Sequence, residues 1–399
     1  MTLKLNYPDK KPDNLCLAPF TMTRPDVRGW NSPCPFGAGD WVQPHLNGEQ
    51  QWHADELNAL RQKHLNNEQA SECTRCYTEE KIGKPSLREL MLGWSDDDTY
   101  EKFIKNEKYL KGPQVIVYRS SNVCNLACRS CGGHDSNQFD KEGKVYQLEY
   151  GEHGNFIAKE PPGHVDMASY IPITDNVNRL EFFGGEPLLN ITQFDILQYL
   201  VDQGRAKDIS LMYNSNATNM PTDRLKDLWK QFKSVEISLS IDGIESRFEY
   251  LRYPGKWDTV LETVEHLQTM DLGIETFIHG NMTLSMQNVL NVDEILNWQF
   301  ETFGNYPWIG FAEGPDYMNI RNFPDYVKEQ ITNVTNYGNK SNEDSIIPYM
   351  NLPQTETYGF KIFCRWMKRM DKYREQSFPT VFPELYSMIE KEWEETLII

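Results

Sequence analysis

Strands and helices alternate along the chain from residue 113 onward, and this pattern constrains the fold more than any other feature. We expect six strands, in QVIVYRSS, NRLEFFGG, ISLMYNSN, VEISLSIDG, IETFIHGNMT and WIGFAEG. Helical segments separate most of them: ITQFDILQYLVDQG, TDRLKDLWKQF, WDTVLETVEHLQTM and NVDEILNWQF. Strands joined by right-handed helical crossovers form a parallel sheet, whose functional face lies at the carboxyl ends of the strands. The sequence therefore predicts an α/β fold, a partial (β/α)6 TIM-like barrel.

Two regions flank the predicted barrel. Residues 1–112 combine proline-rich loops with one polar helix, ADELNALRQKHLNN, and form a cysteine-rich N-terminal region. The barrel is expected over 113–320, followed over 321–399 by a helical C-terminal extension containing FPDYVKEQITNVTNYG, YGFKIFCRWMKRMDKYREQ and PELYSMIEKEWEE. Between the first two strands, residues 132–175 form an insertion punctuated by glycine and proline, which predicts a functional loop.

Charge and hydrophobicity narrow the possible partners. The 399-residue chain carries a formal net charge of −18, which disfavours tight binding to nucleic acids or anionic membranes. The first residues, MTLKLNYPDKKPDN, are polar, and no apolar run reaches the roughly 18–20 residues that cross a bilayer. We therefore expect a cytoplasmic protein without a membrane partner. In a reducing compartment, its eight cysteines indicate metal binding or catalysis rather than disulfides.

Three cysteines follow the first predicted strand closely, in the segment NVCNLACRSCGGHDS: Cys124, Cys128 and Cys131. Spacings of four and three can direct three thiolates at one centre, and such soft ligands favour iron–sulfur clusters, zinc or copper(I). A four-iron cluster usually takes four cysteines, so three would leave one iron open for a substrate or cofactor. The alternative is a structural zinc site completed by His134.

The turn after the second predicted strand has the sequence Gly184, Gly185, Glu186 and Pro187. Paired glycines let a ligand approach the backbone closely, and proline stiffens the turn. A CxxxCxxC loop after strand one together with GGEP after strand two resembles the radical S-adenosylmethionine (radical SAM) superfamily. The resemblance implies a 4Fe–4S cluster on the three cysteines, whose open iron is chelated by the amino and carboxylate groups of SAM. It also implies reductive cleavage of SAM to methionine and a 5′-deoxyadenosyl radical, which abstracts hydrogen from a substrate.

The resemblance extends to further cofactor-binding residues. Gly184, Gly185 and Glu186 would line the SAM amino group, largely through backbone contacts, whereas Ser130 stands where the family usually has an aromatic residue that packs on adenine. Polar residues end the third and fourth strands and suit the ribose: Asn214, Ser215, Asn216, Ser238, Ser240 and Asp242. Arg252 suits the SAM carboxylate through a forked hydrogen bond, with Arg247 as its rival. Ordinary turn or cap chemistry is the alternative role for each.

Four cysteines in the N-terminal region form a second group: Cys16, Cys34, Cys73 and Cys76. One CxxC pair and two scattered thiols indicate a shared metal site. We favour a second 4Fe–4S cluster over zinc, because zinc sites usually show two close cysteine pairs. The segment SECTRCYTEEKIGKPSLRE resembles the auxiliary-cluster region of twitch or SPASM-like radical SAM proteins, including phage-encoded and environmental ones, and implies electron transfer there. Cys364 stands alone on a predicted helix and is expected in the core.

These features predict a radical SAM enzyme that oxidises or rearranges its substrate by hydrogen abstraction. The resemblance implies a peptide or protein side chain or a small metabolite as substrate, and flavodoxin or ferredoxin as electron donor. One alternative is a radical SAM enzyme that modifies a nucleotide or RNA, which the acidic charge disfavours. Another is a catalytically silent, metal-stabilised scaffold, which the intact three-cysteine loop disfavours.

Overall fold

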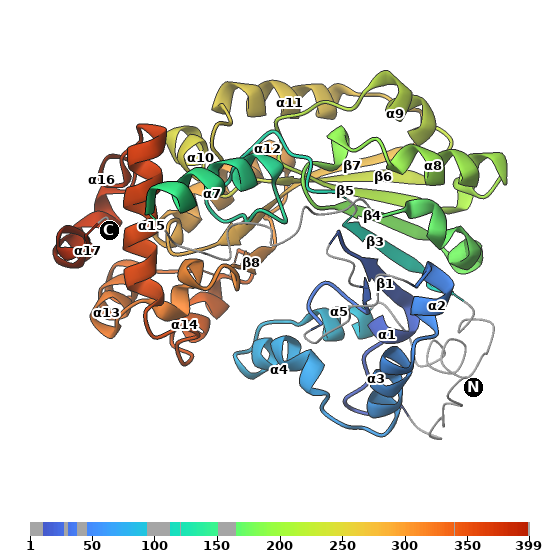
Figure 1. The fold of residues 1–399 in the computed structure, drawn as a ribbon, viewed down its shortest axis with the longest axis horizontal. Coiled ribbons are helices and arrows are strands. Elements are labelled where there is room, and N and C mark those ends of the chain that lie inside the picture. Colours follow the sequence, from blue (N-terminus) through green and yellow to red (C-terminus); the bar gives the residue numbers. More distant parts are fainter. Residues whose placement is uncertain are drawn as a thin grey trace.

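The computed structural model describes residues 11–27, 31–37, 46–93, 112–119, 121–150, 165–338 and 340–397. At its centre lies one eight-stranded sheet with the strand order β2-β1-β3-β4-β5-β6-β7-β8 (Figure 1). Only the β1–β2 pair is antiparallel, and every other neighbouring pair is parallel. From β3 onward the strands lie side by side in chain order, which confirms the predicted partial barrel.

All six predicted strands are present within a few residues of their expected bounds: β3 Val115–Arg119, β4 Arg179–Phe183, β5 Ser210–Ser215, β6 Ser234–Ser240, β7 Glu275–Leu284 and β8 Ile309–Phe311. Alternate residues face opposite sides of each strand. In β4, Leu180 and Phe182 are buried in the core beneath the helices, whereas Arg179 and Glu181 are partly exposed. One face of the sheet is therefore apolar, and the other presents polar side chains.

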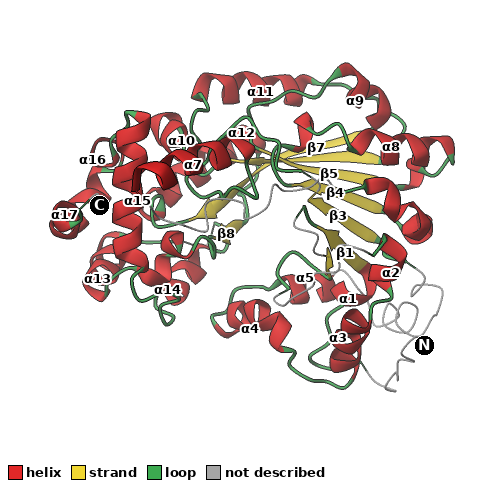
Figure 2. Cartoon of the chain, viewed as in Figure 1, coloured by secondary structure: helices red, strands yellow, loops and turns green. Residues whose placement is uncertain are grey.

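Helices cover the apolar face: α8 Gln193–Asp202, α9 Asp223–Trp229, α10 Glu245–Leu251, α11 Trp257–Thr269 and α12 Val292–Phe303. Local sequence sets their ends. The Thr222 side chain accepts a hydrogen bond from the Leu225 backbone and caps α9, and α12 ends at Gly304 in the left-handed conformation (φ +75°). Figure 2 shows α8, α9 and α11 on one side of the sheet and the N-terminal helices α4 and α5 on the other.

Where the structure describes the N-terminal region, it contains five helices and two strands, most of which the sequence did not predict: α1 Ala18–Thr21, β1 Met22–Pro25, β2 Asn31–Ser32, α2 Gly48–Trp52, α3 Asp55–Leu65, α4 Thr74–Lys81 and α5 Leu87–Gly93. Strand β1 pairs in parallel with β3 and so extends the barrel sheet. Part of the region packs on the polar-face side of the sheet, where Leu17, Phe20 and Met22 share a core with Val117 of β3. Trp52 of α2 instead joins the core on the apolar face. The boundaries predicted at residues 112 and 320 remain predictions.

The insertion at 132–175, predicted as a loop, contains helical structure. Helix α7 spans Asn137–Tyr150, and a 3-10 segment, η3, spans Met167–Asn176. Phe139 and Tyr146 lie seven residues apart and are fully buried, so α7 has an apolar stripe that the glycine and proline content obscured. Residues 151–164 lie outside the described part.

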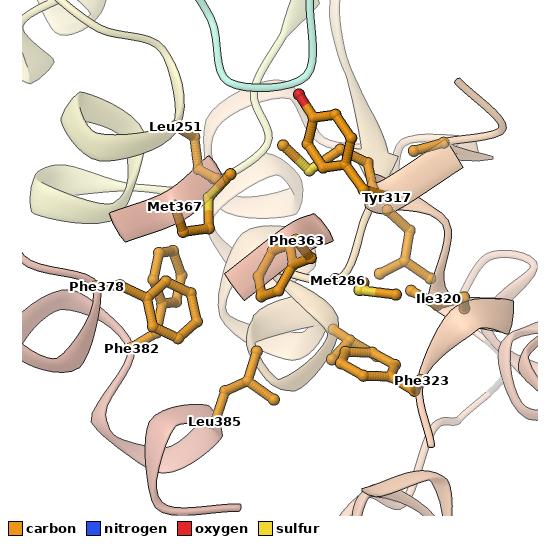
Figure 3. Packing of buried hydrophobic residues seen from close by; sticks show 14 of the residues in the cluster. Leu251, Met286, Tyr317, Ile320, Phe323, Phe363, Met367, Phe378, Phe382 and Leu385 are labelled. Carbon is orange, nitrogen blue, oxygen red and sulfur yellow. The ribbon is translucent and has the colours of Figure 1, made fainter. Parts of the chain in front are cut away.

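The C-terminal extension is helical, as predicted: α13 Asp325–Val334, α14 Ile346–Met350, α15 Gly359–Arg374, α16 Phe378–Val381 and α17 Pro383–Glu395. Short 3-10 turns complete the described secondary structure: η1 Ser71–Cys73, η4 Pro187–Leu189, η5 Ala206–Asp208, η6 Val289–Asn291, η7 Asp316–Met318, η8 Ile320–Asn322 and η9 Glu343–Ser345. The extension shares its core with the barrel, because Phe363 and Met367 of α15 cluster with Leu251 of α10 and Met286 after β7 (Figure 3). Cys364 is fully buried in this core. Within the described residues, no helix has the length and apolar character needed to span a membrane.

Candidate functional site

The three-cysteine loop lies at the carboxyl end of β3, and its thiols gather around Leu126. Cys124 and Cys128 are buried, and Cys131 is half-buried. Burial raises the pKa of Cys124 to about 12. Cys131 donates a hydrogen bond to Cys128, which lowers the pKa of Cys128 and raises that of Cys131. The three sulfurs are thus close enough to influence one another, as a shared metal site requires.

Neighbouring segments hold the backbone of this loop from two sides. On one side, the Glu186 amide donates to the Val123 carbonyl at 2.8 Å. On the other, the Ala127 amide donates to the Tyr253 carbonyl at 2.6 Å, and the Arg129 amide donates to the carbonyl of Leu251 at 2.9 Å. The loop therefore lies between the turn after β4 and the segment after α10.

The paired glycines make the first of these contacts possible. Gly184 and Gly185 have φ values of +80° and +56°, a region that favours glycine. A Cβ atom at Gly185 would lie 2.9 Å from the backbone carbonyl carbons of Asn122 and Val123, and closer still to the carbonyl oxygen of Val123. The glycines thus let the turn approach the cysteine loop closely. Pro187 then begins the 3-10 turn Pro187–Leu189.

The Glu186 carboxylate is fully buried and joins the ends of two strands. Its oxygens accept from the Leu188 amide at 3.1 Å and from the Asn216 amide, just past β5, at 2.7 Å. Burial raises the pKa of Glu186 to about 7. Asn216 also donates through Nδ2 to Asn125 Oδ1 at 2.8 Å and to Cys124 Sγ at 3.7 Å. The turns after β4 and β5, with Glu186 and Asn216, therefore converge on the cysteine loop.

Asp242 and Arg252 form a buried ion pair beside the same loop. Arg252 Nη2 donates to Asp242 Oδ2 at 2.6 Å, and Asp242 Oδ1 accepts from the Thr283 amide at 2.7 Å. Burial by itself lowers the pKa of Arg252, but Asp242 and the thiols of Cys128 and Cys131 raise it above its usual value. The structure thus brings this arginine to the cysteines. Its rival, Arg247, binds Glu294 at 2.6 Å.

A row of polar side chains crosses β5, β6 and β7 on the polar face of the sheet. Asn281 donates to Asn214 Oδ1 at 2.7 Å and to Ser238 Oγ at 2.6 Å, and Ser240 donates to Asn214 Oδ1 at 3.4 Å. Sequence reasoning found three of these residues and missed Asn281. The signal was available, because the β6–β7 register places Asn281 opposite Ser240. Among the remaining candidates, Ser215 is buried, whereas Ser130 and His134 are half-buried within the loop segment.

The four N-terminal cysteines come together from three separate segments and line one pocket with Phe36, Leu87 and Arg88: Cys16, Cys34, Cys73 and Cys76. Burial raises the pKa of Cys34 to about 11 and that of Cys73 to about 12. The pKa of Cys16 is raised by burial and then by Cys34, Cys73 and Cys76. This shared, largely apolar pocket of thiols fits a thiolate-bound metal centre. Among the described residues, no group of three or more His, Cys, Asp or Glu side chains has its ligand atoms close enough together to coordinate a metal ion.

Helix α4 begins directly after Cys73, carries Cys76 and reaches across to the last strand of the barrel. Arg75, between the two cysteines, lies 3.3 Å from the Glu313 carboxylate just past β8, and its guanidinium stacks on Phe36. Lys84 binds Glu79 at 2.5 Å and lies over the ring of Phe311 in β8. The N-terminal pocket is thus connected to both ends of the sheet, through β1 and through β8.

Comparisons with known proteins give a family match over part of the chain. Residues 118–298, from β3 into α12, match the family model described as the radical SAM superfamily. An uncharacterized protein of Methanocaldococcus jannaschii is 24% identical over 155 residues, which is 39% of this chain and 47% of that protein.

Among solved structures, native anSMEcpe with bound AdoMet and Cp18Cys peptide is 17% identical, with 55% of this chain and 60% of that chain covered and a TM-score of 0.33. Streptococcus suis SuiB is 12% identical, with 94% and 74% covered and a TM-score of 0.35. This chain thus spans less than two thirds of the first matched relatives, 47% and 60%. The family match is confined to residues 118–298, which are similar to the radical SAM superfamily.

Proposed function

We propose that this protein is a radical SAM enzyme whose 4Fe–4S cluster is held by the three-cysteine loop: Cys124, Cys128 and Cys131. The observation that carries the proposal is the meeting of three buried or half-buried thiols at the end of β3, inside the region that matches the superfamily. Three thiolate ligands leave one iron of a four-iron cluster free for SAM. When bound, that cluster supplies the electron that cleaves SAM to methionine and a 5′-deoxyadenosyl radical.

The residues around the loop would bind and orient SAM. Arg252 would donate to the SAM carboxylate, because a guanidinium suits a carboxylate geometrically, and Asp242 keeps it oriented through their ion pair. Asn216 and Ser240 would contact the ribose. The backbone of the GGEP turn would line the amino group, with Pro187 limiting the turn's motion.

We further propose that the four N-terminal cysteines hold a second 4Fe–4S cluster that transfers electrons. The shared thiol pocket supports this assignment, with zinc as the competing occupant. For the substrate we propose a peptide or protein side chain or a small metabolite. The polar row of Asn214, Ser238 and Asn281 offers hydrogen-bonding groups for it on the polar face of the sheet.

Anaerobic reconstitution followed by incubation with SAM and dithionite tests the proposal. We expect about eight irons per chain, a change in the electron paramagnetic resonance (EPR) spectrum when SAM is added, and formation of 5′-deoxyadenosine. Replacing the three loop cysteines with alanine should remove about four irons and all SAM cleavage.

The matched control is Cys364→Ala, which removes a cysteine that lies in the core and should change neither iron content nor cleavage. Zinc bound together with about four irons would reassign the N-terminal site to a structural role. A fully loaded protein whose EPR spectrum ignores SAM, and which forms no 5′-deoxyadenosine, would refute the enzymatic proposal.

A further inference from the structure

Helix α15 holds the cysteine loop, although it lies outside the region that matches the superfamily. Its last residue, Arg374, donates through Nη2 to the Ala127 carbonyl at 2.7 Å, one residue before Cys128. The same guanidinium donates through Nε to Glu142 of α7 at 2.7 Å and forms an ion pair with that carboxylate through Nη2. The Arg374 side chain is fully buried. The ion pair between Glu142 of α7 and Arg374 of α15 therefore has its guanidinium group against the loop.

A second buried arginine attaches the loop to the same helix. Arg129, the residue after Cys128, donates through Nη2 to Asp371 of α15 at 2.7 Å and through Nε to the Tyr250 carbonyl at 3.0 Å. Its guanidinium lies 3.6 Å from the centre of the Tyr250 ring. Asp371 in turn accepts from the Phe378 amide at 2.6 Å. Both flanks of Cys128 are thus bound to α15, through the backbone at Ala127 and through the side chain at Arg129.

The surrounding core makes this attachment rigid. Ala127 belongs to the same hydrophobic cluster as Phe363 and Met367 of α15, and Figure 3 shows both side chains in the interior of that cluster. The middle of helix α15 is therefore packed against the barrel, and its charged C-terminal end lies at the loop. Burying a guanidinium group carries a large desolvation cost. Two such groups, those of Arg374 and Arg129, are nevertheless buried beside Cys128. A role in stabilising the fold does not require that placement, because apolar side chains could fill the space.

We propose that Arg374 is a positioning residue for the cluster, which holds the loop at Ala127 and raises the cluster's reduction potential through its buried positive charge. This inference rests on the proposed function of the loop. A reduced cluster carries one more negative charge, and a fixed cation close to it in a region of low dielectric stabilises that form. Hydrogen bonds and charge around cluster ligands are known determinants of potential. Arg252 and Asp242, which also lie beside the loop, form a pair that the substitutions below leave intact.

The test is an anaerobic redox titration of the reconstituted full-length protein with excess SAM, followed by EPR. The signal that changes when SAM is added identifies the SAM-binding cluster. We expect Arg374→Gln to move its midpoint potential to more negative values and Arg374→Lys to restore most of the shift. Lys372→Gln removes the same charge from an exposed position of α15 and should leave the potential unchanged.

The Arg374→Gln variant leaves the Glu142 carboxylate buried without its partner, so a second variant guards against misfolding. The double variant Arg374→Met/Glu142→Met removes both charges and keeps the volume apolar. It should load iron and show a negative shift smaller than that of Arg374→Gln, because the negative charge of Glu142 is lost together with the nearer guanidinium. A fully loaded Arg374→Gln or double variant with the wild-type potential would overturn the inference. A wild-type chain without any SAM-dependent signal would instead refute the proposed function.

Discussion

Gly185→Ala tests whether the GGEP turn positions the cysteine loop by its close backbone approach. Alanine in the left-handed region, where Gly185 has a φ of +56°, costs about 1–2 kcal/mol. The added Cβ would also lie 2.9 Å from backbone carbons of Asn122 and Val123, and such overpacking costs about 1–3 kcal/mol more. The expected loss is therefore about 2–5 kcal/mol of unfolding free energy, together with displacement of the loop.

Gly304→Ala is the matched control. Gly304 has a φ of +75°, and a Cβ there would meet nothing within 4 Å, so only the backbone cost of about 1–2 kcal/mol applies. Urea unfolding of the metal-free proteins, followed by tryptophan fluorescence, measures the difference, and iron content after reconstitution measures the effect on the loop. Equal destabilisation by the two substitutions, with full iron loading in both, would refute the reasoning.

Three further predictions concern charge and metal. Glu236 lies 2.9 Å from His279 Nε2, and the hydrogen bond from His279 is the largest cause that lowers the pKa of Glu236 to about 2. Ionised Glu236 should therefore stabilise the fold by up to about 3 kcal/mol. This contribution is fully present above pH 4.5, the ordinary pKa, and is lost as the pH falls towards 2, so wild type and Glu236→Gln should converge in urea titrations at acidic pH. A constant difference between them would contradict the assigned pKa. Arg252→Met leaves the buried Asp242 carboxylate unpaired and should lose about 3 kcal/mol or more of unfolding free energy. By calorimetry this variant should bind SAM at least about tenfold more weakly, whereas Arg247→Met should bind SAM normally. Weaker binding by Arg247→Met alone would exchange the roles of the two arginines. Elemental analysis of Cys73→Ala should show the loss of about four irons, and a loss of zinc instead would identify zinc as the metal of the N-terminal site. The control Cys364→Ala should keep all its iron and lose only about 1 kcal/mol of unfolding free energy.

Much of the barrel followed from local sequence pattern. The strands are marked by β-branched and aromatic residues between turn signals, and amphipathic segments such as 257–270 have the helical period. The three-cysteine loop was equally accessible, because its ligand spacing lies within ten residues directly after a strand. The same holds for Glu186 and Asn216, since parallel strands bring their carboxyl ends to one edge of the sheet.

Other features had no local signal strong enough to find them. Strand β1 has only four residues, Met22–Pro25, and becomes a strand because β3 offers it an edge to pair with. Helix α7 was obscured by glycine and proline in the surrounding insertion, and only burial of Phe139 and Tyr146 reveals its apolar side. Such elements are decided by tertiary pairing and burial, which override weak local propensity.

By itself, the sequence determined the barrel, the cysteine groups and the polar strand ends, because each depends on residues close together in the chain or on the common direction of parallel strands. Only the tertiary structure placed Arg252 against Asp242 and Arg247 against Glu294, since both arginines follow β6 and differ in what long-range packing places opposite them. It also brought Arg374 to Ala127, 247 residues away. Contacts over that distance arise from the packing of whole helices in a shared core, which no local pattern records.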